Sequence, residues 1–239
     1  MLKVLCFDLD GTLLPMDSKV FIRSYMKELA LYMEEILPQD KLVPLIWDAT
    51  ETMIGDPDGS CTNEQVFTER FLSQAGLKKE EIWPIFDKFY SERFPRLKQQ
   101  VQPSPRSRKV LETALDRGYR VAVATNPVFP GVAIRERMRW AQVEDLVEWV
   151  SVYEETHFCK PNPDYYREVA AAMGVSPEEC AMIGNDVQED LVAGTIGMKT
   201  YLVTDCLIDR GEPTYQPDQK GTMEELLTEI QEGKGIFAS

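Results

Sequence analysis

The sequence predicts an α/β protein with a doubly wound parallel sheet and an all-helical segment inserted after the first strand. Short apolar runs that end in polar residues recur along the chain and alternate with helical patterns. This alternation is typical of a parallel sheet covered by helices. Between residues 16 and 100, by contrast, helical periodicity dominates and no run typical of a buried strand occurs.

Five segments have the pattern of a buried strand. The first, Leu2–Phe7, is an apolar run without alternation, as expected for a strand covered on both faces. It ends in the turn-forming residues Asp8 to Thr12. The other four share this form and are Tyr119–Ala124, Val150–Tyr153, Cys180–Ile183 and Lys199–Val203. Because ligands bind at the carboxyl ends of such strands, we expect the polar residues there to line one crevice.

Helical patterns lie between these strands and in the insertion. One begins at Ser104-Pro105 and ends at Gly118, and another runs from Pro163 to Gly174. The inserted segment, residues 16–100, would stand over the carboxyl end of the first strand as a lid. The sequence therefore predicts a core of residues 1–15 and 101–239 and a helical lid of residues 16–100.

Composition narrows the classes of function. The chain has 239 residues, 26 Lys and Arg against 40 Asp and Glu, and a net charge of −14. Such acidity argues against a nucleic-acid partner, because phosphate backbones are held mainly by Lys and Arg. The longest uncharged stretch, Val121–Ile134, is too short to span a membrane. Asp8 and Asp10 interrupt any apolar leader.

The five cysteines indicate where the protein works. They are scattered, and no two form a Cys-x-x-Cys pair. We therefore expect reduced thiols rather than a disulfide framework or a zinc site, and a cytoplasmic location.

Four polar motifs carry the chemistry. Asp8 and Asp10 follow the first predicted strand in Asp-Leu-Asp-Gly-Thr, and Thr125-Asn126 follow the second. Lys160 precedes a predicted helix in Lys-Pro-Asn-Pro-Asp-Tyr-Tyr, and Asp186 lies in Gly-Asn-Asp-Val-Gln-Glu-Asp. In this order the motifs resemble those of the haloacid dehalogenase-like hydrolases, most of which are phosphatases. The resemblance covers the whole chain and implies a Rossmann-like core, with residues 16–100 as the family's helical cap.

The resemblance also implies roles for these residues. Asp8 would be the nucleophile that forms an aspartyl-phosphate, and Asp10 would protonate the leaving group and later activate water. Mg²⁺ would be held by Asp8, the backbone carbonyl of Asp10, Asp186 and waters. Lys160, with the Thr125 hydroxyl and the Asn126 amide, would neutralise and bind the phosphoryl group.

Elementary electrostatics supports a cation at this place. Carboxylates gathered in one crevice repel one another, which raises the pKa of at least one of them, and a divalent ion together with Lys160 relieves the repulsion. Asp190 lies one helical turn after Asp186 and faces the same way. We expect it to contact Lys160 or a water bound to the metal.

The same residue types occur elsewhere without this context. Asp56-Pro57-Asp58-Gly59 repeats the spacing of Asp8 and Asp10, but it follows no apolar strand and is expected to be a loop. His157 is the only histidine, so no histidine-based triad or metal site can be built.

Several alternatives remain open. A dehalogenase needs neither metal nor an acidic residue two positions after the nucleophile, so Asp10 and Asp186 argue against it. A phosphonatase would need a cap lysine that forms a Schiff base, and nothing marks Lys19, Lys27 or Lys41 for this. A phosphomutase of sugar phosphates uses the same core. A non-catalytic binding or regulatory module is a fourth possibility, although it would not need the complete set of motifs.

The expected substrate is a small phosphorylated metabolite whose identity the core motifs do not specify. Cap residues would select it, and four cations there are candidates for binding a second anionic group: Lys19, Arg23, Arg70 and Arg93. The oligomeric state cannot be read from the sequence.

Overall fold

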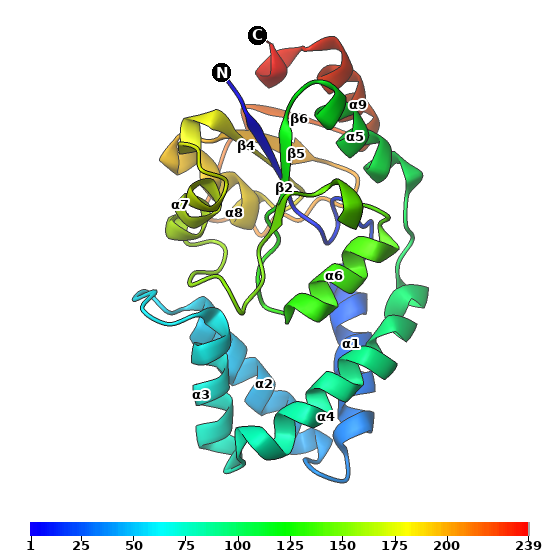
Figure 1. The fold of residues 1–239 in the computed structure, drawn as a ribbon, viewed down its shortest axis with the longest axis vertical. Helices are drawn as coiled ribbons and strands as arrows, with labels where there is room; N and C mark the ends of the chain where they lie inside the picture. Colours follow the sequence, from blue (N-terminus) through cyan, green and yellow to red (C-terminus); the bar gives the residue numbers. More distant parts are fainter. Residues whose placement is uncertain (239) are drawn as a thin grey trace.

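The computed structural model describes residues 1–238, and its centre is a six-stranded sheet in the order β3-β2-β1-β4-β5-β6 (Figure 1). Every neighbouring pair of strands is parallel. The strands are β1 (Val4–Phe7), β2 (Arg120–Val123), β3 (Trp149–Val150), β4 (Cys180–Gly184), β5 (Lys199–Val203) and β6 (Gln219–Gly221). The predicted doubly wound parallel sheet is confirmed.

Strand β1 lies in the interior of the sheet, between β2 and β4, and all four of its residues are buried. Leu5 and Phe7 belong to one apolar cluster, and Val4 and Cys6 belong to another on the opposite face. This explains why the run is apolar without alternation, because side chains on both faces of the strand are covered.

Helices of the core cover both faces. On one face lie α5 (Pro105–Asp116) and α9 (Met223–Glu232), which share an apolar cluster with Leu5 and Phe7. On the other lies α7 (Pro163–Ala172), whose buried tyrosines pack with Val4 and Cys6. The core is completed by α6 (Gly131–Trp140) and the short α8 (Val187–Asp190).

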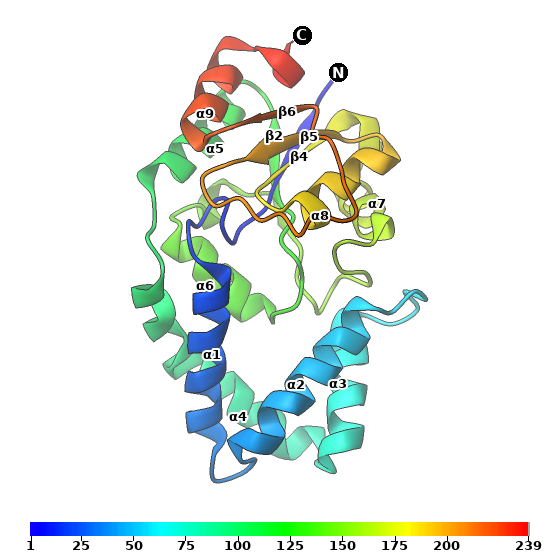
Figure 2. The same cartoon turned by 180° about the vertical axis from the view of Figure 1, so that it is seen from behind.

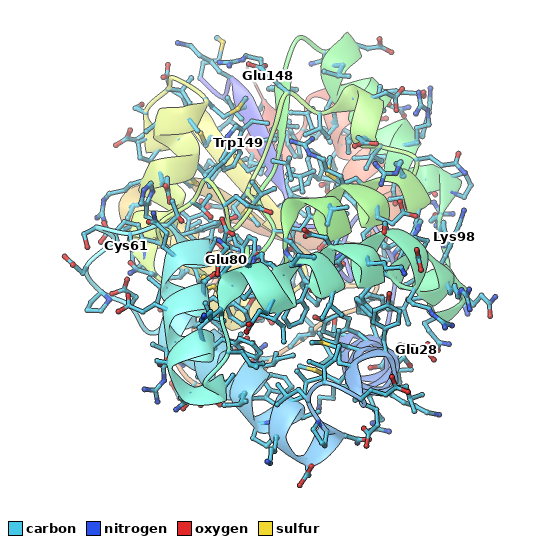
Figure 3. All side chains as sticks on the ribbon, turned by 60° about the horizontal axis from the view of Figure 1, so that its bottom comes forward. Glu28, Cys61, Glu80, Lys98, Glu148 and Trp149 are labelled. Carbon is cyan, nitrogen blue, oxygen red and sulfur yellow. The ribbon has the colours of Figure 1, made fainter. Side chains whose placement is uncertain are left out.

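The segment after β1 is helical, as expected. It contains α1 (Ser18–Met33), α2 (Gln39–Ile54), α3 (Asn63–Ala75), α4 (Lys79–Glu92) and a 3-10 helix, η1 (Phe94–Gln100). Figures 1 and 2 show α1 to α4 together at the end of the molecule away from both termini. Figure 3 views this end, with Cys61 and Lys98 at its two sides.

Two sets of contacts join the helical segment to the core, besides the connecting chain. On one side Phe21 and Phe94 pack against Trp140 of α6, with ring centroids 6.3 and 5.6 Å away. On the other side the buried Asn63, at the start of α3, donates from Nδ2 to Thr156 Oγ1 at 3.0 Å and to the Phe158 carbonyl at 3.1 Å. Its backbone N–H also donates to the Thr156 carbonyl at 2.8 Å. The helical segment is therefore held at both sides.

Some elements differ from the prediction. The strand expected over Val150–Tyr153 ends at Val150. The Ser151 N–H still donates to the Val123 carbonyl of β2 at 3.0 Å, while its hydroxyl donates to the Thr125 carbonyl at 2.6 Å, and beyond it the chain leaves the sheet. Strand β6 was not expected, since Gln219-Lys220-Gly221 forms the sheet edge and carries no apolar run. Within residues 1–238, no helix combines the length and the apolar character that crossing a membrane requires.

Candidate active site

Asp8 lies directly at the carboxyl end of β1, where its N–H donates to the Ile183 carbonyl of β4 at 2.9 Å. The chain then turns sharply at Gly11, whose φ is +89°. A Cβ added at Gly11 would lie 2.5 Å from Nδ2 of Asn185, so glycine is required there twice over. The turn brings the Thr12 hydroxyl to Asn185 Oδ1 at 2.9 Å and to Asp8 Oδ2 at 3.4 Å.

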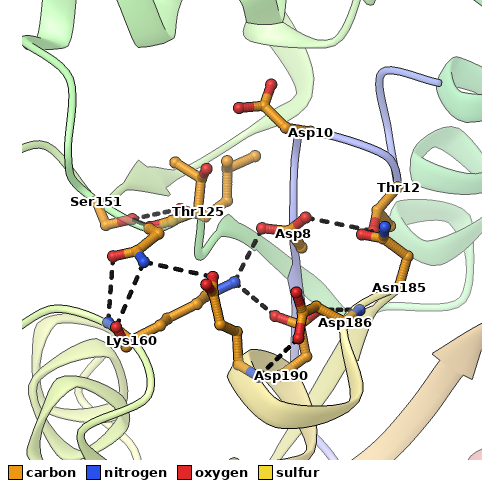
Figure 4. Close-up of polar contacts among 12 residues, drawn as sticks. Asp8, Asp10, Thr12, Thr125, Ser151, Lys160, Asn185, Asp186 and Asp190 are labelled. Atoms are coloured by element: carbon orange, nitrogen blue, oxygen red, sulfur yellow. Dashed lines mark hydrogen bonds and ion pairs between the residues drawn. The ribbon is translucent and has the colours of Figure 1, made fainter. Parts of the chain in front are cut away.

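Lys160 joins two carboxylates from distant parts of the chain (Figure 4). Its Nζ lies 2.9 Å from Asp8 Oδ1 and 2.6 Å from Asp190 Oδ1. The lysine side chain is only 1% exposed, so the pairs are shielded from water and salt. The Lys160 ammonium is therefore held against Asp8, the residue that the sequence predicts to be the nucleophile.

Asp190 also joins Asp186 to this cluster. Its Oδ2 accepts the backbone N–H of Asp186 at 2.9 Å, while Oδ1 faces Lys160. Asp186 Oδ1 in turn caps α8 by accepting the N–H groups of Gln188 and Glu189, each at 3.0 Å. A Cβ added at Gly184 would lie 2.0 Å from Asp190 Oδ2, so the Gly-Asn-Asp sequence leaves the space that Asp190 occupies.

Asp10 has a partner that the sequence did not suggest. Its carboxylate forms an ion pair with Arg137 of α6, a side chain that is fully buried. The guanidinium also stacks 4.4 Å from the ring centroid of Phe129. In Figure 4 the Asp10 carboxylate points away from Lys160. A signal did exist, because Ile134, Arg137 and Met138 share one helical face, which places Arg137 on the buried side of α6.

The pKa values at the site reflect the burial of several carboxylates. Burial raises the pKa of Asp8 and of Asp10, and Lys160 and Arg137 only partly offset it. Burial also raises the pKa of Asp190, to about 7. For Lys160, burial acts to lower the pKa, but the charges of Asp190 and Asp8 outweigh it and raise that pKa above its usual range. The ammonium stays charged, and the carboxylates around it favour a further cation.

Thr125 and Asn126 follow β2 beside this cluster. Thr125 is buried, and its carbonyl accepts hydrogen bonds from Ser151 Oγ and Tyr165 OH at 2.6 and 2.8 Å. The Asn126 side chain brackets Lys160: Oδ1 accepts its N–H at 3.2 Å and Nδ2 donates to its carbonyl at 3.4 Å. The Asn126 amide is thus directed at the backbone of Lys160.

A second arginine lies at the site without any local sequence signal. Arg210, in the loop after β5, places Nη1 2.6 Å from Asp186 Oδ1 and Nη2 3.5 Å from Glu189 Oε1. Backbone hydrogen bonds of Ile208 with Asn185 and Val187, both 2.9 Å, fix this loop against the site. Only the folded chain brings the loop here.

The oxygen donors at this place fit Mg²⁺. The Asp8 Oδ2 atom accepts only the long bond from Thr12. Asp186 Oδ1 already accepts from Arg210 and from two backbone N–H groups, which leaves Asp186 Oδ2 as the oxygen that could bind a metal. The Asp10 side chain is engaged by Arg137. Two carboxylates and a carbonyl, completed by water, are typical of Mg²⁺, which takes few protein ligands. Among the described residues, no three His, Cys, Asp or Glu side chains are grouped to hold a metal ion.

The other candidate residues lie elsewhere and are satisfied locally. Asp56 Oδ1 accepts the N–H of Asp58 at 3.1 Å within its own loop. His157 Nδ1 lies 2.7 Å from Glu168 Oε1. These contacts explain both residues without a catalytic role.

The sequence of the chain matches a known protein family and several curated phosphatases. A family model described as haloacid dehalogenase-like hydrolase matches residues 2–195. The chain is 30% identical over 169 residues to a phosphoserine phosphatase of Thermus thermophilus, covering 69% of this chain and 63% of that protein, which is under two thirds of its length. It is 25% identical to the putative phosphatase YhcW of Bacillus subtilis (85% and 84% covered) and 24% identical to the pyrophosphatase PpaX of Bacillus cereus (89% and 88%).

Solved structures share the fold. A HAD phosphatase from Thermococcus onnurineus superposes with a TM-score of 0.58 at 21% identity, covering 95% of this chain and 97% of that one. An L-2-haloacid dehalogenase from Xanthobacter autotrophicus, with chloropropionic acid covalently bound, gives 0.58 at 15% identity, with 97% and 99% covered. Because phosphatases and dehalogenases fit equally well, the fold does not choose between the two reactions.

Proposed function

The chain belongs to the haloacid dehalogenase-like hydrolases, and from that membership we propose that it is a Mg²⁺-dependent phosphatase acting through an aspartyl-phosphate on Asp8. Its phosphatase-named relatives support a phosphoric monoester hydrolase. The observation that carries the proposal is the buried ion pair between Lys160 Nζ and Asp8 Oδ1, at 2.9 Å. The substrate class that follows is a small phosphorylated metabolite.

In the first proposed step an Asp8 oxygen attacks phosphorus, and the bond to the leaving oxygen breaks. Lys160 lowers the pKa of Asp8 against the effect of burial, which favours the ionised nucleophile, and offers its ammonium to the phosphoryl oxygens. Water then attacks phosphorus, and Asp8 is released as a carboxylate together with inorganic phosphate.

Asp10 would move the protons of both steps. Burial raises its pKa, which favours the protonated carboxyl that must donate to the leaving alkoxide. After donation, the carboxylate accepts a proton from the attacking water. Arg137 would limit the positions that the Asp10 side chain can take, because its guanidinium is itself fixed against Phe129.

Asp8, the Asp10 carbonyl and Asp186 would hold the metal. When bound, Mg²⁺ neutralises charge on the phosphoryl oxygens. Asp190 and Asn126 would act through Lys160: the first contacts its ammonium and the second its backbone. The Thr125 hydroxyl remains a proposed hydrogen-bond donor to the phosphoryl group, together with the Asn126 amide where it is free to turn.

We also propose that residues 16–100 form the cap and that residues 1–15 and 101–239 form the catalytic core. The helices of the first range lie beyond the end of the sheet that carries Asp8, and would enclose the leaving group. All five cysteines are free thiols, which supports a reducing, cytoplasmic location.

The test is a screen of phosphorylated metabolites for release of inorganic phosphate with Mg²⁺. It is repeated in chelator and with Asp8→Asn. Asp56→Asn is the matched control, since it repeats the spacing of the nucleophile motif in a self-contained loop. Phosphate release that persists in chelator or in Asp8→Asn contradicts the proposal. A phosphorylated isomer in place of free phosphate would identify a phosphomutase.

A further inference from the structure

A row of cations on α1 lines a wide cleft between the helical segment and the core. Lys19, Arg23 and Lys27 follow at four-residue spacing, so they share one face of the helix. All three are exposed, and they line a cleft of about 1470 Å³ that also includes Arg210. Figure 2 shows α1 below the orange segment that leads from β5 to β6. Ligand pockets usually measure about 300–1,000 Å³, so this cleft exceeds the needs of a phosphoryl group with a short leaving group.

The row is unfavourable for the protein on its own. Like charges four residues apart repel and destabilise a helix. No acidic residue stands three or four positions from any of the three cations, although the chain has 40 acidic residues. Within residues 1–238 none of the three forms an ion pair with a carboxylate. An anion from outside would relieve this repulsion.

The two acidic residues of the cleft are occupied elsewhere. Asp17 caps α1, and its Oδ1 accepts backbone N–H groups of the first turn at 2.9 and 3.1 Å. Asp209 Oδ1 accepts from Gln188 Nε2 at 3.1 Å and from the Gly211 N–H at 2.8 Å. These two carboxylates face four cations in the lining, Lys19, Arg23, Lys27 and Arg210, so the cleft carries a net positive charge in a protein whose net charge is −14.

The cleft is connected to the candidate active site through Arg210. Arg210, one of its lining residues, lies 2.6 Å from Asp186 Oδ1. From Lys19 to Lys27 the row extends about 12 Å along the helix, at 1.5 Å per residue. Two apolar side chains line the same cleft and are unusually exposed, Trp47 by 44% and Leu207 by 49%. The surroundings suit a leaving group with an apolar body and a distant anion.

We propose that the substrate is a phosphate ester whose leaving group carries a second anionic group, a phosphate or a carboxylate, that binds to Lys19, Arg23 and Lys27. The inference rests on the proposed function and names the substrate class of the same site. Transfer of the phosphoryl group at Asp8 is unchanged, and the row acts only on the far end of the substrate.

The first experiment compares hexane-1,6-diol bisphosphate with hexyl phosphate, which differ only in the distant phosphate. Wild-type enzyme is expected to prefer the bisphosphate at least tenfold in kcat/KM, and salt should reduce this preference. Arg23→Gln should lower it about threefold, and the triple change of Lys19, Arg23 and Lys27 to Gln should abolish it. Lys88→Gln on α4, an exposed lysine outside the cleft, should leave it unchanged. These changes remove repulsion, so thermal unfolding should occur at no lower temperature.

A binding measurement keeps the inference separate from the proposed function. Calorimetry on the Asp8→Asn protein compares hexane-1,6-bisphosphonate with hexylphosphonate, neither of which can be hydrolysed. Tighter binding of the bisphosphonate that is lost in the triple variant supports the row, even if wild-type protein releases no phosphate. Equal binding of the two phosphonates, or a preference that the triple variant retains, overturns the inference. Absence of phosphate release from both esters contradicts only the proposed function.

Discussion

The Nζ atom of Lys160 lies 2.6 Å from Oδ1 of Asp190, and both side chains are only 1% exposed. The same aspartate accepts the backbone N–H of Asp186 through its other oxygen, at 2.9 Å. One carboxylate thus fixes the lysine and the α8 terminus together. A residue that need not touch the substrate determines where two motifs of the candidate site stand.

Replacing Asp190 by Asn should therefore be costly although the shape is kept. Both Asp190 oxygens accept hydrogen bonds, so an Asn would turn its NH₂ group either to the Lys160 ammonium or to the Asp186 N–H. Lys160 keeps Asp8 as a charged partner, so the loss is that of one buried donor left without its acceptor, about 1–3 kcal/mol in free energy of unfolding, which urea denaturation can measure. The control is Asp164→Asn, whose pair with Arg167 is exposed and worth less than about 1 kcal/mol. Similar losses in the two variants would contradict this role.

Asp8→Asn should abolish turnover without loss of stability in chelator. Burial raises the pKa of Asp8, which means that the free energy of burying its charge exceeds the stabilisation from its contact with Lys160. Lys160 keeps Asp190 as its charged partner. Thermal unfolding should thus occur at the same or a higher temperature. Asp48→Asn is the contrast, because Arg70 lowers the pKa of Asp48 and its loss should lower that temperature. A destabilised Asp8→Asn that still turns over would refute the nucleophile.

Arg137→Met should lower kcat by about tenfold or more and should change KM much less. The variant keeps the volume of the buried side chain but leaves the Asp10 carboxylate without its partner. Arg137→Lys should not restore activity, since an ammonium cannot both stack on Phe129 and present a planar donor to Asp10. Arg135→Met, on the exposed face of α6, is the control. Equal kcat in the Met variants at 135 and 137 would exclude the positioning role.

Glu189 makes the free energy of unfolding depend on pH, and its raised pKa sets the direction of that dependence. Burial raises the pKa of Glu189 to about 7, so between its unfolded value and 7 the native state binds more protons than the unfolded state. Stability in chelator should then fall as pH rises from about 4.5 to 7 and stay low above that range. Glu189→Gln should remove this part of the slope in denaturation series.

Asp209→Asn provides a control of opposite sign. The Gly211 N–H, followed by the Gln188 side chain, lowers the pKa of Asp209. Its contribution to stability is present above the unfolded pKa and is lost as pH falls. Asp209→Asn should therefore destabilise the protein at neutral pH, where Glu189→Gln stabilises it. The same direction in both variants would contradict the assignment.

Gly184→Ala tests the space beside Asp190. The added Cβ would lie 2.0 Å from Asp190 Oδ2, and that atom cannot retreat without losing the Asp186 N–H. Overpacking of this kind costs about 1–3 kcal/mol, and the displaced Asp190 should also reduce turnover. Gly194→Ala meets only Thr200 Cγ2 at 3.5 Å and is the matched control. Equal stability of the two variants would count against the close fit.

The sequence predicted those parts that depend on local pattern. The buried run before Asp8 and the glycine turn after it indicated a strand end, and the structure has both. The helical spacing from Asp186 to Asp190 predicted a contact with Lys160 or with a water bound to the metal, and in the structure Asp190 contacts Lys160. The roles of these residues in catalysis stay predictions.

Arg210 and strand β6 could not be predicted in the same way. Arg210 reaches Asp186 only because the loop after β5 folds back on the site, and no spacing in the sequence encodes that path. Strand β6 is formed by Gln219-Lys220-Gly221 at the sheet edge, where pairing with β5 requires no apolar side chains. Of the four cap cations considered, Arg70 is engaged by Asp48 at 2.5 Å, while Lys19 and Arg23 line the cleft.

The attachment of α3 through Asn63, opposite the aromatic contacts of Phe21 and Phe94 with Trp140, has a consequence for molecular traffic. A helical segment that is attached to the core on two opposite sides cannot open by rotating about a single hinge. Substrate would then enter, and product leave, through the cleft between α1 and the loop that carries Arg210. The residues that line this cleft would therefore select the substrate before it reaches Asp8.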